Sequence, residues 1–171
     1  KTCGQFYSLE ELVYYTLKES DNTAYIKLVN YVTKEKLIEF GKKLGAEHTL
    51  EGKDLFGITN CHDMRAYWTE LYRFAKEEEL GKKLKHFLEN PSYKIIDIFP
   101  ENFYRKYGSF DIAYHECGFV EEENPFYIFI MTQKGKQKNR DCFIKKSAKK
   151  IYDIHRRLQK LYQKENQNNQ K

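Results

Sequence analysis

Glu19-Ser20-Asp21-Asn22-Thr23-Ala24 is a short polar turn that separates two helical patterns. Before it, Ser8-Leu9-Glu10-Glu11 has the S-x-x-E form of a capping box, in which side chains bind the free backbone N–H groups at a helix start. Apolar residues recur at helical spacing up to the turn and again after it. Because Ser, Asp and Asn are all good N-cap residues, the plainest interpretation of the turn is the start of the second helix.

A second stretch, Phe103-Tyr104-Arg105-Lys106-Tyr107-Gly108-Ser109, lies where the apolar pattern changes to that of strands. We expect three strands, at Asn102–Tyr107, Ile112–Val120 and Phe126–Gln133, joined by turns around Gly108-Ser109 and Glu121–Asn124. Neighbouring strands on such short connections pair as an antiparallel meander.

Helical patterns surround this region on both sides. After the turn they start at Ala24, at Thr33 (ending at Gly45), at Asn60, at Leu80 (ending near Asn90-Pro91) and at Phe143 (through Leu161). We expect Thr33 and Asn60 to cap their helices, and the polar tail Gln163–Lys171 to be frayed. The predicted fold class is α+β: a helical segment, then a three-stranded antiparallel meander sheet backed by a C-terminal helix.

The two stretches together carry a family resemblance. S-D-N at Ser20–Asn22, followed much later by Lys106-Tyr107-Gly108 where K-T-G would stand, resembles the class A β-lactamase and penicillin-binding protein family. Two strands and a closing helix follow in the family's order. The resemblance covers residues 1–162, which would be a single β-lactamase-like domain that is incomplete at its N-terminus, before the tail at 163–171.

The resemblance implies a role for each matching residue. Ser20 would relay a proton to the leaving group, because a hydroxyl both donates and accepts. Asn22 would hydrogen-bond the substrate's amide, and Lys106 would attract its carboxylate. Gly108 would let the substrate approach the strand, and the N–H of Ser109 would be one donor of an oxyanion hole. Asp21 would brace the turn.

The sequence also departs from the family pattern. No S-x-x-K nucleophile motif precedes Ser20, and the one at Ser147–Lys150 lies in the final helix, in the wrong place. Tyr107 replaces the usual Thr or Ser, so its hydroxyl would not reach a carboxylate as the shorter side chain does. In the loop Ala46–Ile58, neither Glu47 nor Glu51 has the E-x-x-L-N context, so efficient β-lactam hydrolysis is not expected.

Two classes of function remain. In the first, the chain is most of a serine hydrolase or acyl-transferase that acts on a β-lactam or D-alanyl peptide, with its nucleophile on another segment. In the second, the same scaffold is a non-catalytic binding module. A three-stranded sheet exposes unpaired groups at both edges, so we also expect a complementing N-terminal segment or a swapped homo-oligomer.

Composition excludes other classes. The chain has 171 residues, 16% of them aromatic, and a net charge of +5, which suits a globular protein whose lysines lie on solvated helix faces rather than in a nucleic-acid site.

The four cysteines are widely spaced: Cys3, Cys61, Cys117 and Cys142. No metal or other cofactor is therefore expected, and no disulfide pairing follows from the sequence. No apolar run is long enough for a membrane span. The resemblance implies an extracytoplasmic location.

Overall fold

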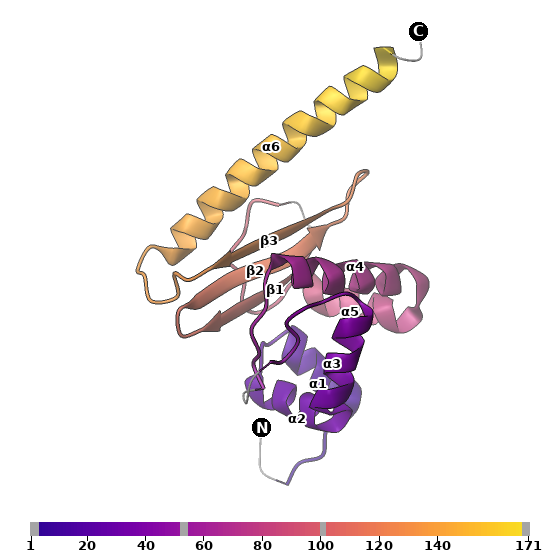
Figure 1. Ribbon diagram of the computed structural model, residues 1–171, viewed down its shortest axis with the longest axis vertical. Helices are drawn as coiled ribbons and strands as arrows, with labels where there is room; N and C mark the ends of the chain where they lie inside the picture. The colour runs from indigo at the N-terminus through magenta and orange to yellow at the C-terminus, as the bar shows by residue number, and fades with distance from the viewer. Residues whose placement is uncertain (1–3, 52–54, 100–101, 169–171) are drawn as a thin grey trace.

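The computed structural model describes residues 4–51, 55–99 and 102–168. A three-stranded sheet lies between a group of shorter helices and one long C-terminal helix that runs past the end of the sheet (Figure 1). The helices are α1 (Leu9–Leu17), α2 (Asn22–Val32), α3 (Lys34–Lys43), α4 (Cys61–Glu77), α5 (Glu79–Glu89) and α6 (Arg140–Asn168), and the strands are β1 (Phe103–Phe110), β2 (Ala113–Val120) and β3 (Phe126–Thr132).

Side-chain caps expected from the sequence mark the starts of α1 and α4. The Ser8 Oγ accepts from the N–H of Glu11 at 3.2 Å while the Glu11 carboxylate accepts from the N–H of Ser8 at 2.7 Å, which is the expected capping box. Asn60 caps α4 through the N–H of Asp63 at 2.9 Å. Thr33 precedes α3 but makes no side-chain cap, so that part of the expectation is wrong: its φ of 75° belongs to a sharp turn between α2 and α3.

The sheet has the strand order β1-β2-β3 and is antiparallel throughout, which confirms the predicted meander. One boundary is wrong. β1 continues to Phe110, so Gly108 and Ser109 lie inside the strand and pair with His115 and Tyr114, not in a turn. The chain instead reverses at Asp111, whose φ of 50° falls in the left-handed region that Asp tolerates better than most residues.

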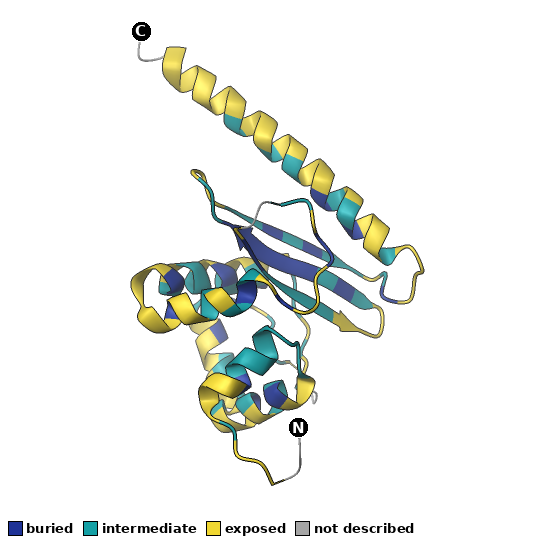
Figure 2. Cartoon of the chain, turned by 180° about the vertical axis from the view of Figure 1, so that it is seen from behind, coloured by how far each residue is buried: buried dark blue, intermediate teal, exposed yellow. Residues whose placement is uncertain are grey.

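Each face of the sheet buries a separate cluster. On one face, Phe103, Tyr114, Val120, Ile128 and Ile130 pack with Ile95, Ile96 and with Ile144 and Ala148 of α6. On the other, Tyr104, Cys117 and Phe119 pack with Trp68 of α4 and Leu88 of α5. Successive strand residues point to opposite faces, so one sheet can serve both clusters. In Figure 2 the central strand is mostly buried.

A buried carboxylate fastens the segment before β1 to the sheet. Glu116 is fully buried, and its Oε2 accepts hydrogen bonds from the N–H groups of Ile95 at 3.0 Å and Ile96 at 2.6 Å. Arg105, on the neighbouring strand, donates to the carbonyl oxygen of Ile96. The three contacts hold residues 95 and 96 against the face of the sheet on which α6 packs.

The long helix α6 is only partly covered. Beyond Ala148 most of the helix is exposed (Figure 2), and it keeps an exposed apolar stripe formed by Ile151, Ile154, Leu158, Leu161 and Tyr162. The helix continues to Asn168, so the expected fraying is wrong for residues 163–168, whose Lys, Glu and Gln residues favour helix. Residues 169–171 lie outside the described part. None of the helices that the described residues form has the length and apolarity that crossing a membrane requires.

Candidate active site

A cleft of about 950 Å³ lies between the helices and the edge strand β1. It brings together segments far apart in the sequence, because Lys106 Nζ donates a hydrogen bond of 2.6 Å to the Oγ of Ser20, which is 86 residues away. All six candidate residues line this cleft: Ser20, Asn22, Lys106, Tyr107, Gly108 and Ser109.

The turn that carries Ser20 is held from several sides. Ser20 has a φ of 53°, a left-handed conformation that persists in a non-glycine residue only when its surroundings fix it. On its C-terminal side, the Asp21 carboxylate caps α2 by accepting from the N–H of Ala24 at 2.7 Å. On its N-terminal side, Glu19 accepts from the hydroxyl of Ser92 at 2.6 Å. These contacts hold the Ser20 backbone in place at the mouth of the cleft.

Lys106 supplies the charge of the site. Its Nζ also donates to the carbonyl oxygen of Tyr107 at 2.6 Å. Burial lowers the pKa of Lys106 to about 8, against the opposing effect of the Glu116 carboxylate. An amine with a pKa near neutrality can be charged when it binds a carboxylate and can still exchange a proton with a neighbouring hydroxyl.

The other candidates surround this pair. Asn22 is the first residue of α2. The Tyr107 ring stacks on the Tyr93 ring with centres 6.1 Å apart and meets the Tyr114 ring edge-on with centres 5.7 Å apart. The Tyr107 ring therefore packs against these two tyrosines. Ser109 is exposed near the end of β1.

His115 is a cleft residue that the sequence motifs do not point to. It pairs with Gly108 across the strands, and a Cβ at Gly108 would collide with the His115 ring, which is a structural reason for glycine there. Burial, and then the charge of Lys106, lower the pKa of His115, so its ring is neutral at neutral pH. The alternation of β2 could have placed His115 on the cleft face, since it shares that face with Cys117 and Phe119.

Within the described residues, no group of three His, Cys, Asp or Glu side chains is arranged to hold a metal ion. Cys61, Cys117 and Cys142 are free thiols. Cys3 lies outside the described residues.

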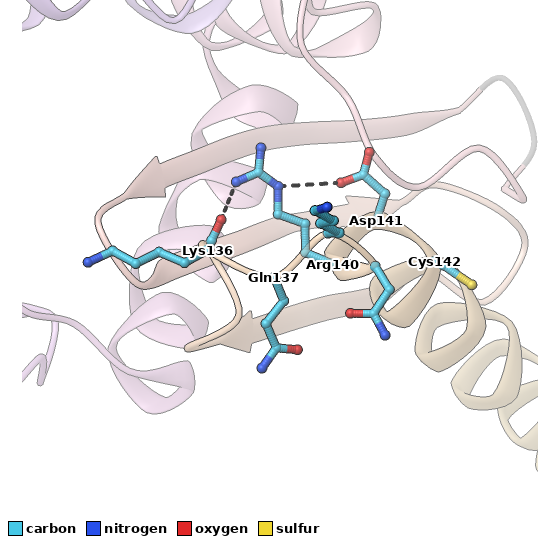
Figure 3. Close-up of a pocket in the computed structure, with 8 residues that line it drawn as sticks. Lys136, Gln137, Arg140, Asp141 and Cys142 are labelled. Carbon is cyan, nitrogen blue, oxygen red and sulfur yellow. Dashed lines mark hydrogen bonds and ion pairs between the residues drawn. The ribbon is translucent and has the colours of Figure 1, made fainter.

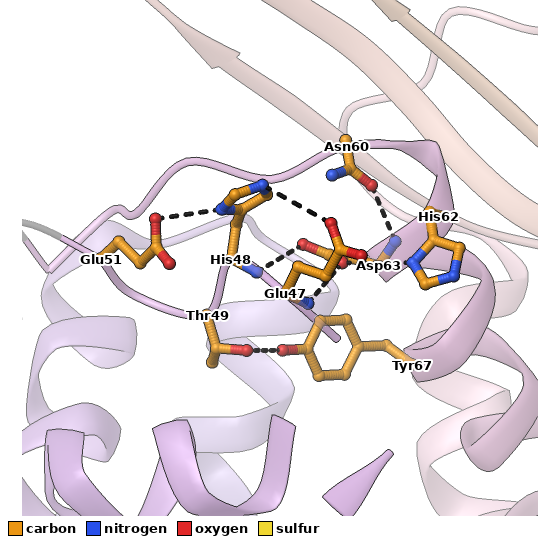
Figure 4. A network of polar contacts seen from close by, with 8 residues as sticks. All are labelled: Glu47, His48, Thr49, Glu51, Asn60, His62, Asp63 and Tyr67. Carbon is orange, nitrogen blue, oxygen red and sulfur yellow. Dashed lines mark hydrogen bonds and ion pairs between the residues drawn. The ribbon is translucent and has the colours of Figure 1, made fainter. Parts of the chain in front are cut away.

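The loop before α4 is held by the buried carboxylate of Asp63 (Figure 4). Asp63 accepts from the N–H groups of Glu47 at 2.8 Å and His48 at 3.0 Å. His48 lines the cleft, and its Nδ1 lies 3.0 Å from the Glu51 carboxylate. Both loop glutamates therefore lie beside His48, and in the described part of the loop neither lines the cleft. Residues 52–54 lie outside the described part.

Replacing Asp63 by Ala is expected to lower the free energy of unfolding by about 2–3 kcal/mol, because two N–H groups lose a charged, buried acceptor. Burial acts to raise the pKa of Asp63, but the hydrogen bonds from Glu47 and His48 outweigh it, so the pKa lies below its ordinary value. The stabilisation is thus present above the pKa of Asp in the unfolded chain and is lost as the pH falls through the lower folded-state pKa. Urea unfolding at pH 7 and pH 3 measures both effects. A loss below 1 kcal/mol at pH 7, or a loss as large at pH 3 as at pH 7, would contradict this role.

A second hollow, of about 510 Å³, lies at the turn before α6 (Figure 3). Only consecutive residues 135–142 line it. Arg140 is tied to the carbonyl oxygen of Gly135 and lies 3.9 Å from the Asp141 carboxylate, so its charge is already engaged. The hollow contains none of the candidate residues, and the main cleft is the better site.

The sequence model of the beta-lactamase enzyme family matches residues 1–155. A β-lactamase from Sphaerobacter thermophilus DSM 20745 superposes with a TM-score of 0.69 at 20% identity, over 80% of this chain and 58% of that one. PBP-A superposes with a TM-score of 0.79 at 14% identity, over 92% of this chain and 64% of its own.

A PBP-A mutant in an acyl-enzyme complex with penicillin-G superposes with a TM-score of 0.78 at 15% identity, over 92% of this chain and 65% of that one. At these identities the superpositions support the fold. The chain spans 58–65% of the length of these three structures. No curated protein matches the sequence.

Proposed function

The chain belongs to the beta-lactamase enzyme family, and from that premise we propose that its cleft binds a β-lactam or a D-alanyl peptide of peptidoglycan as part of a serine hydrolase or acyl-transferase. The observation that carries this proposal is the hydrogen bond between Lys106 and Ser20 inside the cleft. It pairs a group that can carry positive charge with a hydroxyl that can pass on a proton.

Four of the candidate residues have parts in the proposed reaction. The ligand carboxylate binds the Lys106 ammonium group, and the Asn22 amide binds the ligand's amide side chain. A serine nucleophile on another segment gives its hydroxyl proton to the lysine of its own S-x-x-K motif as it forms a bond to the carbonyl carbon, with the oxyanion near the N–H of Ser109. The bond to the leaving nitrogen then breaks, and Ser20 gives that nitrogen a proton as it receives the one held by that lysine. The acyl-enzyme that results is later released by water or by an amine.

We assign the nucleophile to a complementing S-x-x-K segment upstream of Lys1. Two surfaces can receive such a segment: the edge of β3 that β2 does not occupy, and the apolar stripe on α6. An unpaired sheet edge and a row of exposed apolar side chains both favour association. The related structures are longer than this chain, which leaves room for such a segment. A second, swapped copy of the chain is the alternative occupant. The proposed reaction belongs outside the cytoplasm, where peptidoglycan lies.

Intact-mass measurement after incubation with penicillin-G tests the proposal. We expect the chain extended by its upstream coding sequence to gain the mass of one penicillin, because the extension supplies the nucleophile. The extended chain in which the S-x-x-K serine is replaced by Ala is the matched control and should stay unmodified. An extended chain that binds penicillin but gains no mass would favour the non-catalytic binding module. An adduct that survives the serine replacement would contradict the assignment.

A further inference from the structure

The C-terminal helix α6 carries the positive charge excess of the chain. It contains nine Lys and Arg residues against three Asp and Glu residues, whereas the whole chain contains 30 against 25. The rest of the chain therefore has 21 cationic and 22 anionic residues and is close to neutral. A charge excess that is gathered on one element indicates a surface that attracts an anionic partner.

Five of the cations on α6 form one row along the helix. Successive members of the row are four, seven, three and four residues apart, and these spacings return to the same side of a helix with 3.6 residues per turn. All five are exposed, and no residue of the described part forms an ion pair with them: Lys146, Lys150, Arg157, Lys160 and Lys164. We call these five residues the cationic stripe. The stripe is about 27 Å long at the rise of a helix.

Other cations of α6 have acidic partners, which the stripe lacks. Lys145 Nζ lies 2.6 Å from the Asp97 carboxylate, and this pair ties the helix to the segment before β1. Lys149 Nζ lies 3.3 Å from the carboxylate of Asp153, the acidic residue that falls within the row of the stripe. The positive charge of the stripe is therefore left for a partner from outside the described chain.

The stripe points away from the sheet. Ile144 and Ala148 of α6 are fully buried against the sheet, and the His155 ring packs on the Phe126 ring of β3 with centres 4.1 Å apart. Lys146 follows Ile144 by two residues, or about 200° around the helix. The shorter helices lie beyond the other face of the sheet (Figure 1). The stripe is therefore on the outer side of α6, and the cleft is on the far side of the sheet.

The shape of this surface favours an extended flat partner. Among the described residues, those that line the cleft and the hollow at 135–142 include no member of the stripe, so the charges stand on a projecting rod. A small anion on a rod meets one or two charges, whereas a surface of many anionic groups meets the whole row. Arg157 lies one turn from Ile154 and from Leu161, both exposed. Aliphatic side chains beside cations are typical of helices on a lipid surface, whereas single-stranded nucleic acids stack on aromatic rings.

We propose that the cationic stripe binds the surface of an anionic lipid bilayer, with α6 lying parallel to that surface. In this position the helix attaches the chain to a membrane without crossing it. The cleft stays open, because it lies on the far side of the sheet. A complementing segment on the apolar stripe leaves the proposal unchanged, since the charges lie on another side of the helix. The proposal is independent of the proposed function, because it uses no residue of the cleft.

The experiment measures co-sedimentation of the chain with two kinds of vesicle. One kind contains phosphatidylglycerol and phosphatidylcholine in equal parts, and the other contains phosphatidylcholine alone. The stripe variant is Lys150→Gln/Arg157→Gln/Lys160→Gln, because Gln keeps a helix propensity close to that of Lys and Arg. Unchanged circular dichroism and thermal midpoints establish that the variant folds.

The matched control is Lys27→Gln/Lys36→Gln/Lys42→Gln. It removes the same net charge from exposed positions on α2 and α3, and none of these lysines lines the cleft. We expect binding to the phosphatidylglycerol vesicles to fall roughly 100-fold in the stripe variant and at most about threefold in the control, since each cation near an anionic surface contributes about fivefold. A fivefold rise in salt should release the unaltered chain.

Three results would overturn the proposal: no binding to the phosphatidylglycerol vesicles at low salt, equal losses in the two variants, or equal binding to vesicles of phosphatidylcholine alone. A charge-keeping variant, Lys150→Arg/Lys160→Arg, should bind as the unaltered chain does, and a loss there as large as in the stripe variant would contradict an electrostatic contact.

A competitor separates lipid from nucleic acid. We expect a single-stranded oligouridine to leave the chain on the vesicles. If the oligouridine instead displaces the chain and binds it through the same stripe, the partner is a nucleic acid and the proposal is overturned. The affinity of the stripe variant for benzylpenicillin should equal that of the unaltered chain, so failure of the proposed function would not affect this test.

Discussion

Replacing Glu116 by Ala is expected to lower the free energy of unfolding by about 3–5 kcal/mol, the largest effect of any single change considered for this chain. The carboxylate is fully buried and accepts from the N–H groups of Ile95 and Ile96. Its removal leaves both N–H groups without their acceptor and leaves the half-buried charge of Arg105 with Asp97 but without Glu116 as a countercharge. The penalty for unpaired buried groups exceeds the net value of the contacts themselves.

Urea unfolding followed by the fluorescence of Trp68, the single tryptophan, measures this loss. Glu116→Gln is the matched control, because the amide keeps one oxygen for the two N–H groups but removes the charge. We expect it to cost much less than the Ala variant, because it keeps an acceptor for the two N–H groups and removes a charge that burial disfavours. A loss below about 1 kcal/mol in Glu116→Ala would contradict the role assigned to this carboxylate.

The pH dependence of the free energy of unfolding of these variants provides a second test. Burial raises the pKa of Glu116, although the hydrogen bonds from Ile96 and Ile95 oppose the shift. The folded chain therefore holds this proton more tightly than the unfolded chain does. Stability from this group is present below the unfolded pKa and is lost as the pH rises through the folded one. Glu116→Gln removes that dependence.

Replacing Lys106 by Met is expected to weaken the binding of benzylpenicillin at pH 7 by about 30-fold or more, because a partly buried charge that pairs with the ligand carboxylate is worth at least about 2 kcal/mol. The ammonium group lies in the cleft beside Ser20, where a carboxylate would meet little competing solvent. Lys150→Met is the matched control: it removes the same charge from an exposed position on α6. Equal losses in the two variants would mean that only net charge matters.

The pKa of about 8 for Lys106 predicts the pH range of this binding. Affinity for a carboxylate ligand should hold below pH 8 and fall above it, as the amine loses its proton. Stability runs the other way: between about pH 8 and the ordinary lysine value the unfolded chain binds a proton that the folded chain has released, so stability rises with pH. Calorimetric titration from pH 6.5 to 9.5 measures the affinity, and Lys106→Met should show no such fall.

Local signals in the sequence predicted most of the elements. The capping box at Ser8 and the cap at Asn60 depend on residues within one helical turn, so a short window contains all the information. The meander likewise follows from short connections between strands. Gly108 misled the placement of the first turn, because glycine is a turn signal, whereas here it makes room for His115 across the strands.

The candidate site depends on contacts that no short window contains. Ser20 and Lys106 were paired through the order of motifs in a family, and the structure places their side chains in contact; their catalytic roles stay predictions. The burial of Glu116 and the stacking of Phe56 on Phe110 depend on register and on loop closure. A lone Glu or Phe in the sequence carries no sign of either.

The most direct test of the ligand site is an NMR titration of the isotope-labelled chain with benzylpenicillin. We predict that the backbone amides of Ser20, Asn22 and Ser109 shift together along one binding curve, and that the affinity which this curve gives is lower in Lys106→Met. Shifts confined to the hollow at residues 135–142, or no shift at these three amides at saturating ligand, would contradict it.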